Sequence, residues 1–342
     1  MTPTCLNESE MAAAKDMDLS GLLESAPPKP TTPLRFVDIA VTATAKEFAG
    51  IYRGKQYHEP DFAATLPRAA SAGVEKVMLT GMSLDDVDFN TKLVEQHPTQ
   101  CSLTIGIHPY HAAIPEADLQ AEMVRLEQCV DKALGTTPCP ISAFGELGLD
   151  HDRTNHASKE DQARVFRAQM DLIATKQWDL PLFLHCRAAC DDFIEMISPY
   201  LPRLKRKGVV HSFVGSTAEM HKLLDLGLDI SVNAFSFADR ESIDMVAAVP
   251  LDRLHLETDS PWGEIKSTSP LATRYCTNAP ALPSSKKRDK WDPAHMVKER
   301  NESCALSMVA FIVAGLSGVS VDEVATAAWE NSNAMFNFID VN

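Results

Sequence analysis

Residues 182–213 have the sequence LFLHCRAACDDFIEMISPYLPRLKRKGVVHSF. This stretch begins with a short apolar run, Leu182–His185, continues through an amphipathic stretch with helical spacing, and ends in a second apolar run, Gly208–Phe213. Short apolar runs are typical of strands that are buried on both faces, and a helix is the usual connection between parallel strands. The stretch therefore predicts a strand–helix–strand unit of a parallel sheet.

The same unit recurs along the chain from Leu34 onward. The predicted strands are Leu34–Val41, Val74–Thr80, Cys101–Ile107, Ile141–Glu146, Leu182–His185, Gly208–Phe213, Asp229–Val232 and Leu254–Thr258. Eight such strands with helices between them favour a closed (β/α)₈ barrel of the α/β class, which normally takes about 250 residues. An open doubly wound sheet is the alternative. We expect one barrel domain over residues 34–342, preceded by a flexible, acidic, Pro-rich extension over residues 1–33.

Helix starts are predicted where a serine stands three residues before an acidic residue. The serine can accept a hydrogen bond from an unpaired backbone N–H, and the acid favours the positive end of the helix dipole. The four segments with this pattern are Ser83–Asp86, Ser158–Asp161, Ser216–Glu219 and Ser320–Glu323.

The charge of the chain limits the kinds of partner that it can bind over its whole surface. The 342 residues include 32 Lys and Arg against 47 Asp and Glu, a formal net charge of −15. This acidity argues against a surface that binds nucleic acid everywhere, but not against a local basic site. Two segments are candidates for such a site. They are Arg53 and Lys55 in GIYRGKQ, and the lysines and arginine of SSKKRDK at 284–290.

We expect no membrane anchor and no secretory leader. The longest apolar run, Met308–Leu316, is shorter than the roughly 20 residues that cross a bilayer, and the N-terminal stretch is acidic without an apolar core. The eight cysteines include no CxxC pair, which argues against a structural zinc ribbon, and without a secretory leader reduced thiols are expected. The expected location is the cytoplasm, the nucleus or both, with the mitochondrion left open. Protein partners cannot be predicted from the sequence.

Polar side chains interrupt five of the predicted strands at or near their ends. They are His108, Glu146, His185, His211 and Asp259. In a barrel all strand ends of one kind face the same mouth, where active sites are built, so these side chains are expected to converge. Neutral imidazole supplies nitrogen and ionised carboxylate supplies oxygen and charge, which together predict a metal site.

The motifs around these residues resemble a known family. VDIAVTATAKEF, GIYRGKQ, GIHPYH, FGELGLD, FLHCR, VVHSFVGS and ETDSPW are similar to the motifs of the TatD-type metal-dependent deoxyribonucleases of the amidohydrolase superfamily. The similarity runs from about Arg35 to Phe336 and is greatest to the eukaryotic members. It implies a (β/α)₈ barrel that cleaves DNA phosphodiester bonds with divalent cations, as a 3′–5′ exonuclease, an endonuclease or both.

The resemblance also implies roles for individual residues. By motif, the metal ligands would be Glu146, His185, His211 and Asp259, and His108 would help to bind the substrate phosphate. Many members of the superfamily have His-x-His after the aspartate of the first strand, where this chain has Ala40 and Thr42. The remaining ligands suit a weakly held, hydrated Mg²⁺, with Mn²⁺ or Zn²⁺ as alternatives.

The expected reaction is hydrolysis by a water that the metal activates. Asp259 or Glu146, whichever reaches that water, would orient or deprotonate it. Arg187 and His108 could hold phosphate charge, and Arg53 and Lys55 favour an anionic polymer such as DNA as the substrate. Two other functions stay open: hydrolysis of an amide or lactone on the same scaffold, and nucleic-acid binding by a catalytically weakened protein.

Overall fold

A computed structural model describes residues 18–338, and its central feature is a parallel eight-stranded sheet. Along the sheet the order is β1-β4-β5-β6-β7-β8-β9-β10, and an isolated parallel bridge joins Val41 of β1 to Ser260, which follows β10 in the chain. The strands are β1 (Phe36–Val41), β4 (Val74–Leu79), β5 (Cys101–Ile105), β6 (Ile141–Asp150), β7 (Leu182–Arg187), β8 (Gly208–His211), β9 (Asp229–Val232) and β10 (Leu254–Leu256). The predicted (β/α)₈ barrel is confirmed.

The predicted strands all exist, but several of their ends are different. Asp229–Val232 has the predicted bounds, and most other strands begin or end one or two residues away. The large difference is in β6, which was expected to end at Glu146 and continues to Asp150. All but one of its ten residues are buried, so the charged Glu146 lies inside the strand.

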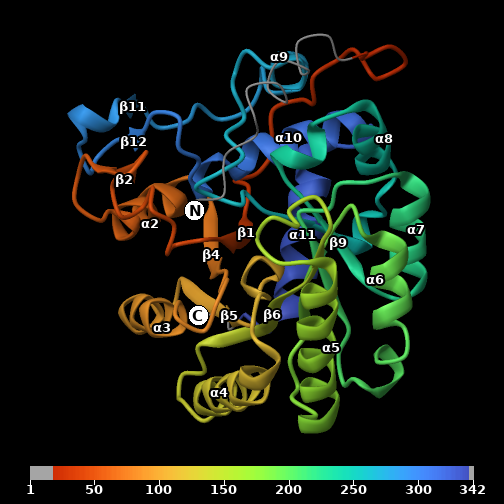
Figure 1. The fold of residues 1–342 in the computed structure, drawn as a ribbon. Helices are drawn as coiled ribbons and strands as arrows, with labels where there is room; N and C mark the ends of the chain where they lie inside the picture. The colour runs from red at the N-terminus through yellow and green to blue at the C-terminus, as the bar shows by residue number, and fades with distance from the viewer. Residues whose placement is uncertain (1–17, 339–342) are drawn as a thin grey trace. The chain divides into compact units, whose positions relative to one another are not determined.

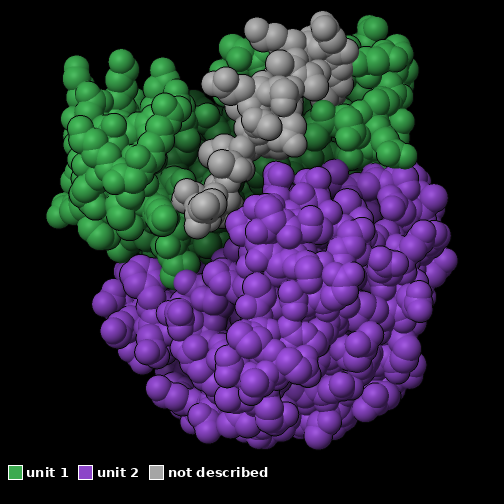
Figure 2. Space-filling model, viewed as in Figure 1, with its two compact units in different colours: residues 1–77, 232–331 green, residues 78–231, 332–342 purple. Residues whose placement is uncertain are grey.

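The chain divides into two compact units, residues 1–77 with 232–331 and residues 78–231 with 332–342 (Figure 2). In the second unit, α5 packs on β6, and α3 and α4 pack on β5. Figure 1 shows helices α3 to α7 around the outside of the strands of this unit. Its helices are α3 (Val87–Gln96), α4 (Glu116–Leu134), α5 (Lys159–Lys176), α6 (Cys190–Ile197) and α7 (Thr217–Asp225), with short 3₁₀ turns η1 (Pro109–His111) and η2 (Leu201–Arg203).

Three of the four predicted helix caps are confirmed. Ser158 accepts a hydrogen bond from the backbone N–H of Asp161, and Ser216 forms a reciprocal capping box with Glu219. Ser320 and Glu323 also exchange hydrogen bonds, at 3.2 and 2.9 Å. The prediction for Ser83 is wrong, because α3 starts at Val87 and the Asp86 carboxylate instead accepts from Ser83.

The first unit contains two small sheets and the most apolar helix of the described chain. Its elements outside the barrel strands are β2 (Ile51–Tyr52), β3 (Lys55–Gln56), α2 (Phe62–Ser71), η3 (Ala234–Phe237), α8 (Arg240–Ala248), η4 (Leu251–Arg253), α9 (Pro270–Tyr275), β11 (Ser285–Lys286), η5 (Arg288–Lys290), β12 (Met296–Val297), η6 (Ser303–Ala305), α10 (Leu306–Ser317) and the start of α11 (Val321–Phe336). Residues 306–316 of α10 are all buried, as expected for a helix that is apolar all round, and α10 packs on α8, α9 and β10.

Within residues 18–338, no single helix is long and apolar enough to cross a membrane. One bent pair of helical segments, Ser303–Ser317 and Val321–Phe336, meets the length and composition requirement only when the two are taken together.

Part of the predicted N-terminal extension is held against the first unit. Residues 1–17 lie outside the described part. The segment 18–33 has no helix or strand, but its backbone carbonyls accept hydrogen bonds from several later side chains. Arg240 donates to the Ser20 carbonyl at 2.7 Å, the Tyr275 hydroxyl donates to that of Leu23 at 2.8 Å, and Asn278 donates to that of Pro27 at 2.8 Å.

Candidate metal centre

A buried cluster of three histidines surrounds a single carboxylate oxygen in the second unit. Oε1 of Glu146 lies 2.9 Å from Nδ1 of His185, 2.5 Å from Nε2 of His211 and 3.2 Å from Nε2 of His108. All four side chains are buried. Four of the five strand-end residues that the sequence singled out therefore meet at one point.

The glycines of β6 allow this strand to approach β7 closely enough to form the cluster. Gly145 and Gly148 have φ values of 150° and 151°, and a Cβ on either would collide with a backbone carbonyl of β7. In the parallel register Gly148 lies opposite His185, and the register shifts between Gly145 and Leu147. The shift places Glu146 at an irregularity of the strand, where its side chain reaches the imidazoles.

Asp150 is a member of the cluster that the sequence analysis missed. Its Oδ2 lies 3.0 Å from Nε2 of His185, so the imidazole stands between two carboxylates. The signal was present in the sequence, since Glu146, Gly148 and Asp150 alternate with Leu147 and Leu149. Alternation of this kind indicates a strand that continues with one polar face.

Neighbouring charges keep both carboxylates of the cluster ionised. Burial opposes ionisation of Glu146, but His211, His108 and the hydrogen bonds from the imidazoles hold its pKa well below the usual range. Burial likewise opposes ionisation of Asp150, yet the hydrogen bond with His185 and nearby positive charge lower its pKa to about 2. Ionised carboxylates are the form that binds a cation.

The histidines of the cluster differ in their protonation. Burial lowers the pKa of His108 to about 4, so this imidazole is neutral at pH 7. Burial also acts against protonation of His185, but its hydrogen bonds with Asp150 and Glu146 raise its pKa overall.

The tautomer of His108 follows from its surroundings. Its Nδ1 accepts a hydrogen bond from the backbone N–H of Tyr110 at 3.0 Å. A neutral imidazole that accepts at one nitrogen carries its proton on the other, so Nε2–H of His108 faces Glu146 as a donor. A nitrogen that holds a proton is a poor metal ligand and a good donor to phosphate.

The chemistry of the cluster fits a divalent metal ion. Atoms of His108, Glu146 and His185 lie within 4.8 Å of one another, and all three side chains are buried. Nitrogen and carboxylate oxygen are ligands that divalent transition metals accept, and carboxylate suits Mg²⁺ and Mn²⁺.

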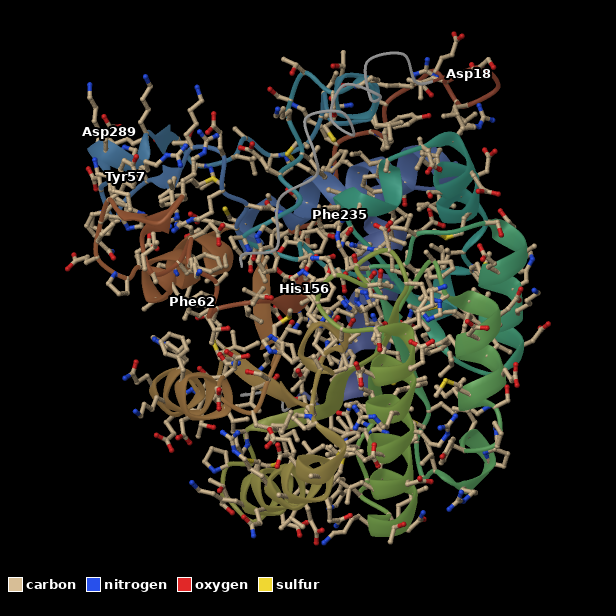
Figure 3. The ribbon with its side chains drawn as sticks, viewed as in Figure 1. Asp18, Tyr57, Phe62, His156, Phe235 and Asp289 are labelled. Carbon is tan, nitrogen blue, oxygen red and sulfur yellow. The ribbon has the colours of Figure 1, made fainter. Side chains whose placement is uncertain are left out.

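Arg187 ends β7 and is partly buried, and its charge helps to lower the pKa of Asp150. Tyr110 also borders the cluster. The centre of its ring lies 4.4 Å from that of His108, edge to face, and 4.4 Å from that of His156, on which it stacks (His156 is labelled in Figure 3). This corner of the second unit thus offers a guanidinium and aromatic rings beside the candidate metal ligands.

The other predicted site residues belong to the first unit. Asp259 follows β10 with a φ of 53°, and the next residue, Ser260, accepts a hydrogen bond from Thr42 at 2.9 Å. Arg53 and Lys55 are exposed on the β2–β3 hairpin. Their roles as ligand and as phosphate-binding residues stay predictions.

Comparison with known proteins gives consistent matches over most of the chain. Residues 37–337 match the family described as TatD related DNase. Deoxyribonuclease Tat-D of Schizosaccharomyces pombe is 38% identical over 306 residues, which cover 87% of this chain and 95% of that protein. The 3′-5′ ssDNA/RNA exonuclease TatD of Erwinia amylovora is 34% identical over 302 residues, covering 87% of this chain and 98% of that protein. The solved structure of a hydrolase TatD family protein from Entamoeba histolytica has a TM-score of 0.80 at 28% identity, covering 90% of this chain and 100% of the other.

Proposed function

The chain belongs to the TatD related DNase family, and on this premise we propose that it hydrolyses DNA phosphodiester bonds with a divalent metal ion. The observation that carries this proposal is the buried carboxylate oxygen of Glu146 among three imidazoles. The matched relative that is named a 3′-5′ ssDNA/RNA exonuclease supports removal of nucleotides from the 3′ end of a single strand.

The proposed ligands are Glu146, His185, His211 and Asp259. These residues would hold a divalent ion, which would supply Lewis acidity toward a phosphodiester oxygen and a lowered pKa for a bound water. The Asp150 carboxylate accepts a hydrogen bond from Nε2–H of His185 and thereby turns Nδ1 toward Glu146. The carboxylate behind this histidine thus fixes which nitrogen is offered as a ligand.

The substrate phosphate is proposed to bind His108 and Arg187. His108 is neutral and carries its proton on Nε2, so it donates one hydrogen bond without adding charge. Arg187 adds a fixed positive charge and up to five donors. Glu146 or Asp259, whichever reaches the attacking water, would orient or deprotonate it.

We further propose that the ion is Mg²⁺ and that it is held loosely. Ala40 and Thr42, both buried, stand where the His-x-His pair would supply two more imidazoles. Mg²⁺ is usually held by one or two carboxylates and substrate phosphate rather than by a closed protein cage. Extensive dialysis should leave protein with little metal that regains activity with millimolar Mg²⁺. Elemental analysis that found two zinc ions per chain in active, dialysed protein would contradict this.

The function is tested with a 5′-fluorescein single-stranded oligonucleotide and Mg²⁺, with and without EDTA. We expect cleavage that EDTA abolishes, and a loss of at least about 100-fold (roughly 2.7 kcal/mol of barrier) in His185→Ala and in His211→Ala. His221→Ala is the matched control, since His221 is exposed on α7. Parent-like cleavage by both folded cluster variants would refute the metal-site assignment. Hydrolysis of amide or lactone substrates without cleavage of DNA would favour the alternative enzyme class.

A further inference from the structure

The β2–β3 hairpin presents two exposed basic side chains on a tight turn. Ile51 pairs with Gln56 and Tyr52 with Lys55, which leaves Arg53 and Gly54 as the two turn residues. Both have positive φ, 51° and 78°, the conformation of a type I′ turn. Arginine is uncommon at such a position, where asparagine or glycine is favoured. Within residues 18–338 neither Arg53 nor Lys55 forms an ion pair, so both charges are available to a ligand.

A second basic segment lies in residues 284–299, around β11, η5 and β12. Lys287, Lys290 and Lys298 are exposed, and none of them forms an ion pair within the described part of the chain. Two further basic residues are paired: Lys286 with Asp292 at 2.6 Å, and Arg288 with Glu299 at 3.3 Å.

Contacts between aromatic and charged side chains join the hairpin to this segment. The Arg288 guanidinium lies 4.8 Å from the ring centre of Tyr52 and 5.5 Å from that of Tyr57. His58 stacks on Trp291, with ring centres 5.3 Å apart and planes at 4°. Figure 3 shows labelled Tyr57 and Asp289 close together at one edge of the ribbon, among side chains with nitrogen tips. The hairpin and the segment therefore form one surface.

A buried network of ion pairs and hydrogen bonds holds the side chains under this surface in place. Arg300 donates to both carboxylate oxygens of Asp61, at 2.6 and 2.9 Å, and to Glu302 at 2.9 Å. Asp61 also accepts from the indole N–H of Trp291 at 2.9 Å, and Arg68 donates to Glu302 at 2.8 Å. A surface that is held in this way loses little conformational entropy when it binds a partner.

The charge of this surface is opposite to that of the chain. Residues 51–59 and 284–299 contain seven Lys and Arg against four Asp and Glu, whereas the whole chain has a net charge of −15. An anionic polymer is repelled by most of the molecule and attracted here. The ring of Tyr57 is 38% exposed and lies 5.1 Å from the Lys55 ammonium. An exposed ring among cations is the arrangement with which proteins stack unpaired bases and hold the phosphates beside them.

We propose that this surface, here called the hairpin platform, binds a single strand of nucleic acid outside the metal centre. The platform consists of Arg53, Lys55, Tyr57, Lys287, Arg288, Lys290 and Lys298. This proposal rests on the proposed function, because the bound strand is taken to be the substrate of the nuclease. The lysines and Arg53 contact phosphates, and Tyr57 stacks on a base, which only an unpaired strand exposes.

The test is fluorescence anisotropy of fluorescein-labelled dT20 in EDTA, where binding is measured without cleavage. The double variant Lys287→Ser and Lys290→Ser should reduce the steepness of log Kd against log salt by about 1.4, since each phosphate contact on a single strand contributes about 0.7. Tyr57→Ala should weaken binding of dT20 about tenfold and leave binding of a duplex unchanged.

Matched controls come from the second unit. The double variant Lys132→Ser and Lys205→Ser removes two exposed lysines that form no ion pair within residues 18–338, and Phe89→Ala removes a ring that is 45% exposed. If the platform variants bind dT20 like these controls, the proposal is overturned. Equal competition by polyglutamate and dT20 would also overturn it, because the site would then be one for acidic polypeptides.

A second readout separates the platform from the catalytic proposal. Hydrolysis of bis(p-nitrophenyl) phosphate, a diester without a strand, should have the same kcat/KM in parent and platform variants, while kcat/KM for long single-stranded DNA should fall. Loss of dT20 binding in the variants of a protein that hydrolyses no diester would uphold the platform and refute the proposed function. Normal hydrolysis of the diester by platform variants that bind dT20 like the parent would uphold the proposed function and refute the platform.

Discussion

Replacing Asp150 with Asn removes a charge from behind His185 while keeping the shape of the side chain. Asp150 is fully buried, and its Oδ2 lies 3.0 Å from Nε2 of His185. We expect the variant to bind Mn²⁺ more weakly, because a carboxylate behind a ligating imidazole raises its basicity and fixes its orientation. Loss of such a partner typically lowers metal affinity 10- to 100-fold, about 1.4 to 2.7 kcal/mol.

The geometry favours the lower end of that range. The amide oxygen of asparagine can still accept from Nε2–H, so the hydrogen bond is kept and only its charge assistance is lost. A hydrogen bond with a charged partner contributes about 1.5 to 3 kcal/mol against about 1 for a neutral one. The difference is roughly 0.5 to 2 kcal/mol, and its midpoint corresponds to about tenfold weaker binding.

The assay is isothermal titration of metal-free protein with Mn²⁺ at pH 7.5. Asp152→Asn is the control, since Asp152 lies two residues after Asp150 and its side chain is 52% exposed. This variant removes the same charge from a position outside the cluster. A second readout is the NMR titration of His185 in metal-free protein, where loss of the carboxylate should lower the imidazole pKa. A Kd within twofold of the parent, with an unchanged His185 titration, would refute the positioning role.

Three further predictions concern stability. Deleting residues 1–32 should lower the free energy of unfolding by about 2 kcal/mol, since it removes several hydrogen bonds with later residues. The deletion should change cleavage less than threefold, and an inactive, folded truncation would contradict this. Arg300→Ala should lower the free energy of unfolding in urea by about 3 to 5 kcal/mol, because two buried carboxylates lose their partner; a loss under 1 kcal/mol would show that the network contributes little. Burial raises the pKa of Asp38 to about 6, so ionised Asp38 destabilises the fold above pH 6 and stability should rise as pH falls from 7 toward 4. Asp38→Asn should flatten this rise by at most about 3 kcal/mol, and identical pH profiles of parent and variant would exclude Asp38 as its source.

The fold could be predicted because most strand residues are buried on both faces and are therefore apolar. Asp229–Val232 was found with its bounds, and Ser158 and Ser216 marked helix starts through local hydrogen bonds. The prediction failed at Ser83, where the same pattern is a turn. There the carboxylate of Asp86 caps the backbone of the turn, and the helix begins after it.

Most of the candidate site could be predicted because histidine and glutamate are rare inside apolar strands. His108, Glu146, His185 and His211 were identified in this way, and the structure brings them together. Asp150 was missed because a charged residue was taken as the end of its strand. The contact between Asp150 and His185 depends on the register of β6 on β7, and the close approach of two glycines sets that register.

The discontinuity of the first unit has a consequence for the order of events during synthesis. On one edge β1 pairs with β4, which is made soon after it, and Phe36 N–H donates to the Gly73 carbonyl just before β4 at 2.8 Å. On its other edge β1 contacts β10, which begins only at Leu254. The ribosome makes roughly 210 residues between the two strands, about 10 to 40 s of translation at ordinary rates. Throughout that interval an apolar strand with one unpaired edge is exposed, which is the kind of surface that pairs with other chains. The nascent protein is therefore most vulnerable to aggregation before its last barrel strand leaves the ribosome, and a holdase that binds apolar segments would act in this window.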